Sequence, residues 1–318
     1  MSIDKSSSHP YLVSICIPTY NEPILFKRCL DSILSQDYPL IEIIISDDSS
    51  LPDIKAIVEL VSTPFSITYK SNYPALKSPE NWNSALDMAS GDLVMLMHHD
   101  DLFKYKSSVR SFVEVFRNNP MADLVFSTPH EMDEAGRSFT YSYSLKIFTK
   151  MLEQPHRLFV GNYFGHPSNL MFKKNIVRYR KDLVWMVDME YYYQLIKLGL
   201  NAVFTSESFV ITGVHENQTT VFCLAHPDIA LREHILISAS FSGKEFCDLV
   251  LYDHYWRQLR NNSIRDVHDP MLKETVVPEP ILHMLRYLTI LPVRLTFIGF
   301  VSKAMMLVSY LLWRLRSK

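Results

Sequence analysis

Two apolar runs in this chain end on pairs of adjacent acidic residues, and this repeated pattern limits the possible folds more than any other feature. The run 41–46 is followed by Asp47 and Asp48, and the run 93–97, after two histidines, by Asp100 and Asp101. Such runs are typical of strands that are buried on both faces of a parallel sheet. Because open α/β sheets bind ligands beyond the carboxyl ends of their strands, two acidic pairs at one edge indicate a site for a divalent cation and a polyphosphate.

Strand-like and helix-like segments alternate as far as residue 130, which is typical of βαβ units. Strands are expected to begin near Val13, Ile41, Ser66, Asp92 and Ala122. Helices are expected over Pro23–Gln36, Pro79–Ser90 and Ser107–Arg117. Connections of this length give parallel strands with right-handed crossovers. We therefore predict an α/β fold with a mostly parallel sheet flanked by helices.

The pattern is less regular after residue 130. Residues 131–143 predict a hairpin or an excursion loop, and a turn-rich segment over 161–168 precedes a short apolar strand. The segments expected after it are a strand over Asn169–Phe172, a helix over Val187–Leu198, a strand over Ala202–Thr212 and helices beyond Asp228. We therefore expect an N-terminal extension over residues 1–12, a mixed domain over 13–225 and a helical C-terminal region over 226–318.

Charge and cysteine usage exclude some classes of protein. The formal net charge of −2 argues against a general nucleic-acid-binding protein, which would carry a basic excess. No pair of cysteines has the C-x-x-C spacing, so we interpret them as reduced residues of a cytosolic protein and not as zinc ligands. They are Cys16, Cys29, Cys223 and Cys247. Residues 1–10 lack the apolar segment of a secretory signal.

The C-terminal segment is apolar and carries basic but no acidic residues from Pro280 to Lys318. Its basic residues are Arg286, Arg294, Lys303, Arg314, Arg316 and Lys318. Three residues interrupt the run of about 20 apolar residues that a membrane-spanning helix needs: Arg294, Gly299 and Lys303. We expect an amphipathic segment that contacts an anionic membrane surface. The alternative is a helical pair packed on the preceding domain with its basic residues in water.

Four segments, in this order, resemble the successive signatures of family-2 glycosyltransferases. They are VSICIPTYNE (13–22), IIISDDSS (43–50), NWNSALDMASGD (81–92) and HHDD (98–101). Members of that family are inverting enzymes of the GT-A fold that use nucleotide-sugar donors and a divalent metal. The resemblance extends from Val13 to His215 and implies that residues 13–225 form a GT-A catalytic domain.

The resemblance also implies a donor site at the strand ends. The implied nucleotide-sugar ligands are Pro18, Thr19, Tyr20, Glu22, Asp47, Asp48, Asn83 and Asp100. The resemblance implies that Pro18, Thr19, Tyr20 and Glu22 line the base and ribose. The loop 18–22 also precedes a helix N-terminus, where free N–H groups favour an anionic ligand. Asp47 would hold the base, most plausibly uracil, Asp48 would support that loop, and Asp100 would face the ribose and the metal.

A divalent metal, Mg²⁺ or Mn²⁺, is the implied cofactor. Asp101 would be its main protein ligand, with Asp100 beside it. His98 stands where the commoner D-x-D-D motif has its first acid, so the prediction of metal binding depends on the two aspartates. The alternative is that His98 and His99 are partly solvated neutral imidazoles without a metal. His215 would be a third ligand or would stabilise the departing diphosphate, unless it is ordinary polar surface.

An inverting transferase needs a base that deprotonates the acceptor hydroxyl. The segment VDMEYYY (187–193) resembles the family's motif of acids followed by aromatics, with Val187 in place of the first acid. Asp188 is the implied base, and Glu190 is the second choice. From the residues alone, Asp188 could instead be a helix N-cap, and Glu190 a solvated acid of the first turn. His166 is a candidate for the acceptor site, or a turn residue before Pro167.

The resemblance thus implies transfer of a sugar from a UDP-linked donor to a hydroxyl acceptor. A lipid-linked oligosaccharide of bacterial O-antigen or capsule synthesis, on the cytoplasmic face of the inner membrane, is the expected acceptor. One alternative is a nucleotidyltransferase that makes nucleotide sugars, but the loop PTYNE lacks the glycine and lysine of a phosphate-binding loop. The other is a membrane-docked protein that binds nucleotide sugars without turnover, which Asp100, Asp101 and Asp188 disfavour.

Overall fold

The computed structural model describes residues 10–141, 144–216, 218–273, 275–290 and 292–317. Its internal contacts divide the chain into two compact units. The first, the α/β unit, comprises Met1–Glu153, Tyr163–Asp182 and Gln194–His215. The second, the helical unit, comprises Gln154–Asn162, Leu183–Tyr193 and Glu216–Lys318. Since these units interleave along the chain, the domain boundary near residue 225 stays a prediction.

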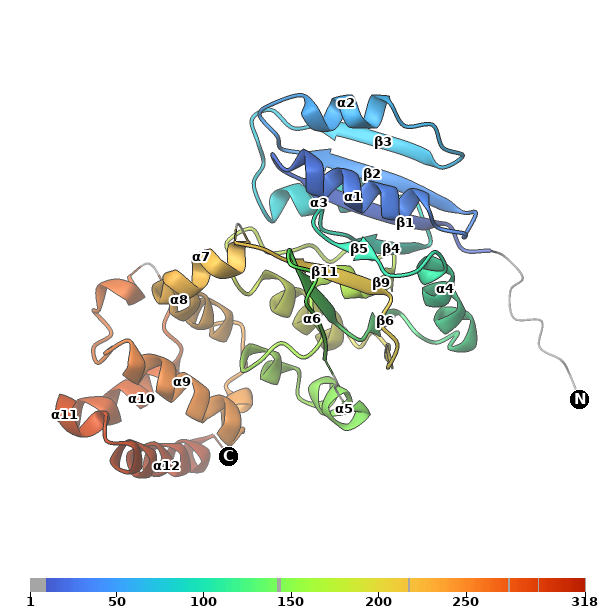
Figure 1. Cartoon of the computed structure of the whole chain (residues 1–318). Coiled ribbons are helices and arrows are strands. Elements are labelled where there is room, and N and C mark those ends of the chain that lie inside the picture. The colour runs from blue at the N-terminus through green and yellow to red at the C-terminus, as the bar shows by residue number, and fades with distance from the viewer. Residues whose placement is uncertain (1–9, 142–143, 217, 274, 291, 318) are drawn as a thin grey trace, which may run out of the picture. The chain divides into compact units, whose positions relative to one another are not determined.

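The described part of the α/β unit contains a seven-stranded sheet in the order β10-β6-β9-β4-β1-β2-β3 (Figure 1). Its strands are β1 (Val13–Thr19), β2 (Ile41–Asp47), β3 (Ser66–Ser71), β4 (Leu93–Leu96), β6 (Leu124–Ser127), β9 (Leu170–Lys173) and β10 (Ala202–Thr205). All pair in parallel except β9, which is antiparallel to both β4 and β6. The predicted α/β fold with a mostly parallel sheet is therefore confirmed.

The helices of this unit bury apolar faces against the sheet. They are α1 (Pro23–Leu34), α2 (Asp53–Glu59), α3 (Glu80–Met88), α4 (Ser108–Asn118) and α5 (Leu145–Glu153). Side chains at helical spacing in α1, among them Phe26 and Leu30, form one core with β1, β2 and β4. The predictions of α1, α3 and α4 are confirmed, whereas the short helices α2 and α5 were not predicted.

A smaller sheet has the order β5-β11-β7-β8. Its strands are β5 (Leu102–Phe103), β7 (His130–Asp133), β8 (Ser138–Thr140) and β11 (Val210–Val214). Strands β7 and β8 confirm the hairpin predicted after residue 130, of which residues 142–143 lie outside the described residues. The prediction of one strand over Ala202–Thr212 is wrong: polar residues 206–208 separate β10 from β11, which belong to different sheets.

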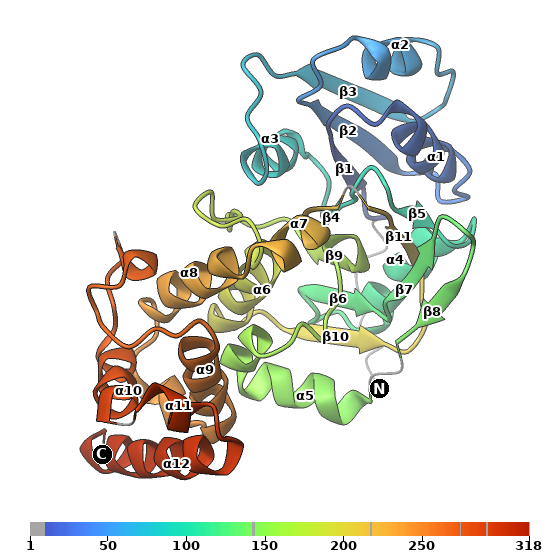
Figure 2. The ribbon, with the colours of Figure 1, turned by 60° about the vertical axis from the view of Figure 1, so that its left-hand side comes forward.

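The helical unit has a core of its own, as the helical pattern beyond Asp228 predicts. Its α-helices are α7 (Thr219–Ala225), α8 (Pro227–Ser238), α9 (Leu249–Asn261), α10 (Glu279–Ile290), α11 (Val293–Thr296) and α12 (Gly299–Arg316). Figure 2 shows α10 and α12 side by side, as does Figure 1. Trp256 and Tyr255 of α9, Met284 of α10 and Met306 of α12 meet in this core.

Shorter elements complete the chain. The described residues also form the 3-10 helices η1 (Pro155–Phe159), η2 (Pro167–Asn169), η3 (Lys244–Cys247) and η4 (Pro270–Leu272). Helix α6 (Val187–Lys197) begins in the helical unit and ends in the α/β unit. The four cysteines are free thiols, as expected from their spacing. Among the described helices, none has the length and hydropathy needed to cross a membrane.

Candidate active site

The carboxyl ends of β1, β2 and β4 meet at one edge of the sheet. Strand β1 pairs in parallel with both neighbours, and Thr19 at its end lies opposite Asp47. The backbone carbonyl of Thr19 accepts hydrogen bonds from Asp48 N (3.0 Å) and from Asn81 Nδ2 (3.2 Å). His99 Nδ1, after β4, donates to the carbonyl of Pro18 (3.3 Å). Three loops far apart in the sequence are therefore held together.

Asp47 is buried and held in one orientation. Its Oδ1 accepts a hydrogen bond from Ser49 N (2.8 Å), and its Oδ2 accepts one from the hydroxyl of Tyr69 (2.7 Å). Burial, together with the Asp47 carboxylate, raises the pKa of the Tyr69 hydroxyl. Tyr69 therefore stays protonated and donates to Asp47, which keeps this carboxylate at the edge of the sheet.

Asp48 organises the loop after β3. Its carboxylate accepts hydrogen bonds from the backbone nitrogens of Leu76 (3.1 Å) and Lys77 (2.6 Å) and from Asn72 Nδ2 (2.9 Å). Each bond joins residues at least 24 positions apart. These contacts suit the loop-supporting role that the resemblance implies for Asp48.

The other residues expected at the donor site have different surroundings. Pro18 and Thr19 are buried, Glu22 is half-buried, and Tyr20 is 56% exposed. Both ends of the Asn83 amide bond the backbone of Tyr179, each at 2.8 Å, so this side chain joins α3 to a distant segment. Contact of Asn83 with a donor stays a prediction.

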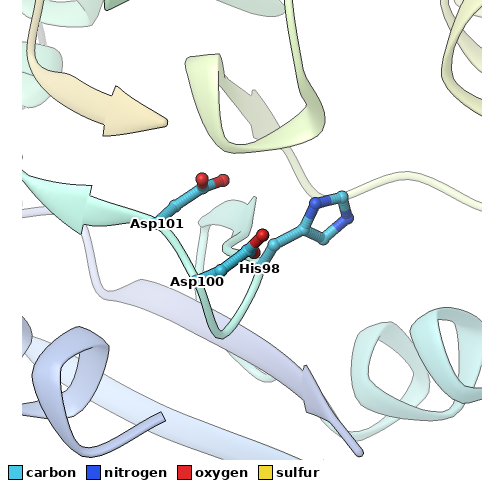
Figure 3. Close-up of side chains that lie close together, drawn as sticks. All are labelled: His98, Asp100 and Asp101. Carbon is cyan, nitrogen blue, oxygen red and sulfur yellow. The ribbon is translucent and has the colours of Figure 1, made fainter. Parts of the chain in front are cut away.

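His98, Asp100 and Asp101 form a group of side chains after β4 that could hold a metal ion. Figure 3 shows the three side chains on one loop, and one ligand atom from each lies within 4.8 Å of the others. The Asp101 carboxylate is buried and accepts hydrogen bonds from Ser168 Oγ and from Gly213 N (3.1 Å). Burial and the neighbouring charge of Asp100 raise the pKa of Asp101 to about 7. Two carboxylates and an imidazole so close together fit a divalent cation.

The surroundings of His98 suit a metal ligand beside the two aspartates that the resemblance implies. Burial lowers its pKa to about 4, so the imidazole is neutral and able to bind a metal. Its Nε2 is buried and has no hydrogen-bond partner among the described residues. The ring packs on Trp82, with 4.7 Å between ring centroids. His98 stands at the first acid of the D-x-D-D motif, and this position is the sequence signal that makes it a ligand candidate.

His215 lies beside this group at the end of β11. Its Nε2 donates to Asp100 Oδ2 (3.0 Å), and this hydrogen bond raises the pKa of His215. Gly213 allows the approach, since a Cβ on it would lie 2.5 Å from the carbonyl oxygen of Asp100. His215 is thus brought to the predicted place, although its ring contacts a ligand candidate and its own metal contact stays a prediction.

The candidates for base and acceptor contact belong to two units. His166 of the α/β unit lies 3.5 Å from Glu131 Oε1. Asp188 and Glu190 lie in the first turn of α6, within the helical unit. Asp188 accepts hydrogen bonds from Asn162 Nδ2 (2.7 Å) and Met189 N (2.8 Å). Glu190 is only 1% exposed, which contradicts its reading as a solvated acid.

Replacement of Gly213 tests whether β11 supports the metal-ligating group. In Gly213→Ala the new methyl must push Asp100 or β11 aside, so we expect Mn²⁺ affinity to fall about tenfold or more. Titration calorimetry with Mn²⁺ measures the change. Gly299→Ala is the matched control, because a Cβ there meets no described atom within 4 Å. Equal affinities of the two variants would contradict the supporting role.

Comparison with known proteins shows the family to which this chain belongs. The model of the family described as "Glycosyl transferase family 2" matches residues 14–180. A GalNAc(5)-diNAcBac-PP-undecaprenol beta-1,3-glucosyltransferase of Campylobacter jejuni is 37% identical over 91 residues, which are 28% of this chain and 29% of that protein.

Two solved structures share the fold at 16% sequence identity. S. aureus TarS 1–349 in complex with UDP-GlcNAc has a TM-score of 0.60 over 94% of this chain and 89% of that one. The mannosyltransferase PcManGT from Pyrobaculum calidifontis, in complex with GDP-Man and Mn²⁺, has a TM-score of 0.54 over 95% of this chain and 74% of that one. The family match covers more than half of the chain and includes the loops that carry Asp47, Asp48, Asp100 and Asp101. The chain therefore belongs to glycosyl transferase family 2 and is a glycosyltransferase.

Proposed function

We propose that this glycosyltransferase moves a sugar from a UDP-linked donor to a hydroxyl acceptor, with inversion at the anomeric carbon. The observation that carries the proposal is the group His98, Asp100 and Asp101 at the same sheet edge as Asp47. Cation ligands beside a base-binding carboxylate suit a nucleoside diphosphate. Family membership displaces the nucleotidyltransferase alternative.

A uracil nucleotide suits the edge formed by β1 and β2. Asp47 is oriented by Ser49 and Tyr69 and has further lone pairs to accept the imide N–H of uracil. Tyr20 is exposed in the adjacent loop, where its ring could stack on the base. The UDP-GlcNAc complex of TarS, which shares the fold, supports this choice of donor.

His98, Asp100 and Asp101 are the residues that would hold the divalent cation. The buried, unpartnered Nε2 of His98 and the paired carboxylates fit such a group. A bound cation supplies positive charge that offsets the charge of the departing diphosphate. An imidazole ligand favours Mn²⁺ over Mg²⁺, and the Mn²⁺ in the PcManGT complex agrees with this choice. His215 holds Asp100 in place through its hydrogen bond.

Asp188 is proposed as the general base. The acceptor oxygen attacks the anomeric carbon as its proton passes to the Asp188 carboxylate, and the bond to the diphosphate oxygen breaks with its electron pair on UDP. Asn162 orients the carboxylate through a 2.7 Å hydrogen bond. Glu190 is less suited because it is almost fully buried.

The proposed acceptor is a lipid-linked oligosaccharide of surface-polysaccharide synthesis. The name of the Campylobacter jejuni relative describes transfer to a glycan on undecaprenyl diphosphate, which supports this acceptor class. His166, whose Nε2 lies 3.5 Å from Glu131 Oε1, is the residue of the α/β unit that we propose contacts the acceptor. A lipid-linked acceptor places the enzyme on the cytoplasmic face of the inner membrane as a peripheral protein.

Removal of one carboxylate tests the metal role. Asp101→Asn keeps the volume and loses the charge, so we expect transfer to fall more than about 100-fold while the fold survives. Release of UDP in the presence of Mn²⁺ measures transfer, and circular dichroism checks the fold. Asp53→Asn, an exposed carboxylate of α2, is the matched control. Undiminished transfer by Asp101→Asn would refute the metal role.

Loss of the base should separate binding from chemistry. Asp188→Asn is expected to bind UDP-sugar with unchanged affinity and to lose transfer by about 100-fold to 10,000-fold. Calorimetry measures binding, and a radiolabelled donor measures transfer. Asp228→Asn is the control, because Asp228 is an acid in the first turn of another helix of the same unit. A normal rate in Asp188→Asn would mean that another residue is the base.

A further inference from the structure

Helix α12 is apolar on two opposite faces, and the described part of the chain covers only one of them. The inner face packs in the core of the helical unit through Met306, Tyr310 and Trp313. The outer face is exposed, with exposed fractions of 79% for Phe300 and 71% for Leu315. A surface helix of a water-facing protein normally presents polar side chains on its outer face. The outer face of α12 therefore suits an apolar environment.

The exposed apolar residues form a continuous stripe. Positions 300, 304, 307, 311 and 315 follow the i, i+4, i+7 spacing of one helix face. We name the outer apolar face for its exposed members Phe300, Leu307, Val308, Leu311, Leu312 and Leu315. The chain just before α12 adds further exposed side chains, namely Ile290, Val293, Leu295, Phe297 and Ile298. Neighbouring exposed apolar side chains of this kind mark a surface that binds a protein or a membrane.

The edges of the outer apolar face are basic. At 100° per residue, Lys303 and Arg314 flank one side of the stripe and Arg316 flanks the other, with Arg294 in the preceding helix α11. Lys303 pairs with Asp253 at 3.0 Å, and Arg314 lies 5.8 Å from the ring centroid of Tyr310. Asp253 offsets the charge of Lys303, whereas the segment 280–318 has no acidic residue to offset the charges of Arg294, Arg314 and Arg316.

We propose that the outer apolar face docks on an anionic phospholipid surface, with α12 lying in the plane of the headgroups. Apolar side chains would enter the acyl boundary, while the flanking arginines would meet lipid phosphates. Charge complementarity favours lipid over a second copy of the chain, since two copies would bring like-charged edges together. The inference deepens the proposed function, because a lipid-linked acceptor would be presented on the same surface.

Vesicle flotation of the full-length protein tests this proposal. We expect the protein to bind vesicles of phosphatidylcholine that contain about 30 mol% of the anionic lipid phosphatidylglycerol, and salt should weaken this binding. We expect little binding to vesicles of phosphatidylcholine alone. The double variant Leu311→Asp/Leu315→Asp should lose binding at least about tenfold, since it places two carboxylates in the stripe. Leu60→Asp/Leu198→Asp is the matched control, because both leucines are exposed in the α/β unit.

A second variant separates charge from apolar burial. Arg294→Glu/Arg316→Glu should abolish the preference for anionic vesicles. The proposal is overturned if the wild-type protein ignores anionic vesicles, or if the leucine variant and its control bind equally. It is also overturned if light scattering shows that the wild-type protein is a dimer and that Leu311→Asp/Leu315→Asp, but not its control, dissociates this dimer. Flotation needs no donor, so its failure leaves the transferase proposal intact, and a failure of transfer leaves the docking result intact.

Discussion

The parallel pairing of β1 with both β2 and β4 is the constraint on which the candidate site depends. In a parallel sheet the strand ends point the same way, so the residues that follow three different strands reach one edge. The register places Thr19 beside Asp47. The hydrogen bond from Met97 N to Cys16 O extends the pairing of β4 with β1 toward the same edge of the sheet. Slippage of one residue in either pair would turn these carboxylates to another face.

The second sheet completes this edge. Strand β11 brings Gly213 N to Asp101 and His215 to Asp100, across more than 110 positions of sequence. Ser168, just before β9, bonds both Asp101 and the backbone of His98. The two acids after β4 are therefore held from two directions, which is the preorganisation that a metal site requires. The helical unit contains Asp188, the proposed base, in the first turn of α6.

Much of the sheet could be predicted from the sequence, because buried parallel strands are continuous apolar runs and the acids that follow mark their ends. The contacts that define the site could not. The amide of Asn83, for example, donates a hydrogen bond to a backbone carbonyl 96 positions away. No local sequence pattern predicts such a partner. The polar residues 206–208 mark the division of the segment 202–212 into two strands, but the pairing of its halves with different sheets depends on tertiary contacts.

His98 shows the same limit at the site itself. A motif compares residue types, so a histidine in place of an acid counted against metal binding. The structure places this histidine within reach of Asp100 and Asp101, with a neutral, half-buried ring whose Nε2 atom is buried. Burial and the turn after β4 decide that outcome, and neither can be read from spacing. A departure from a motif can therefore leave a group of candidate metal ligands in place.

The central claim is that a divalent cation and a nucleoside diphosphate bind together at the edge formed by β1, β2 and β4. Calorimetric titration of UDP into the protein, once with Mn²⁺ and once with EDTA, tests this claim most directly. The account predicts that UDP binds tightly with Mn²⁺ and that chelation abolishes most of this affinity. Equal affinity for UDP in both buffers would contradict it.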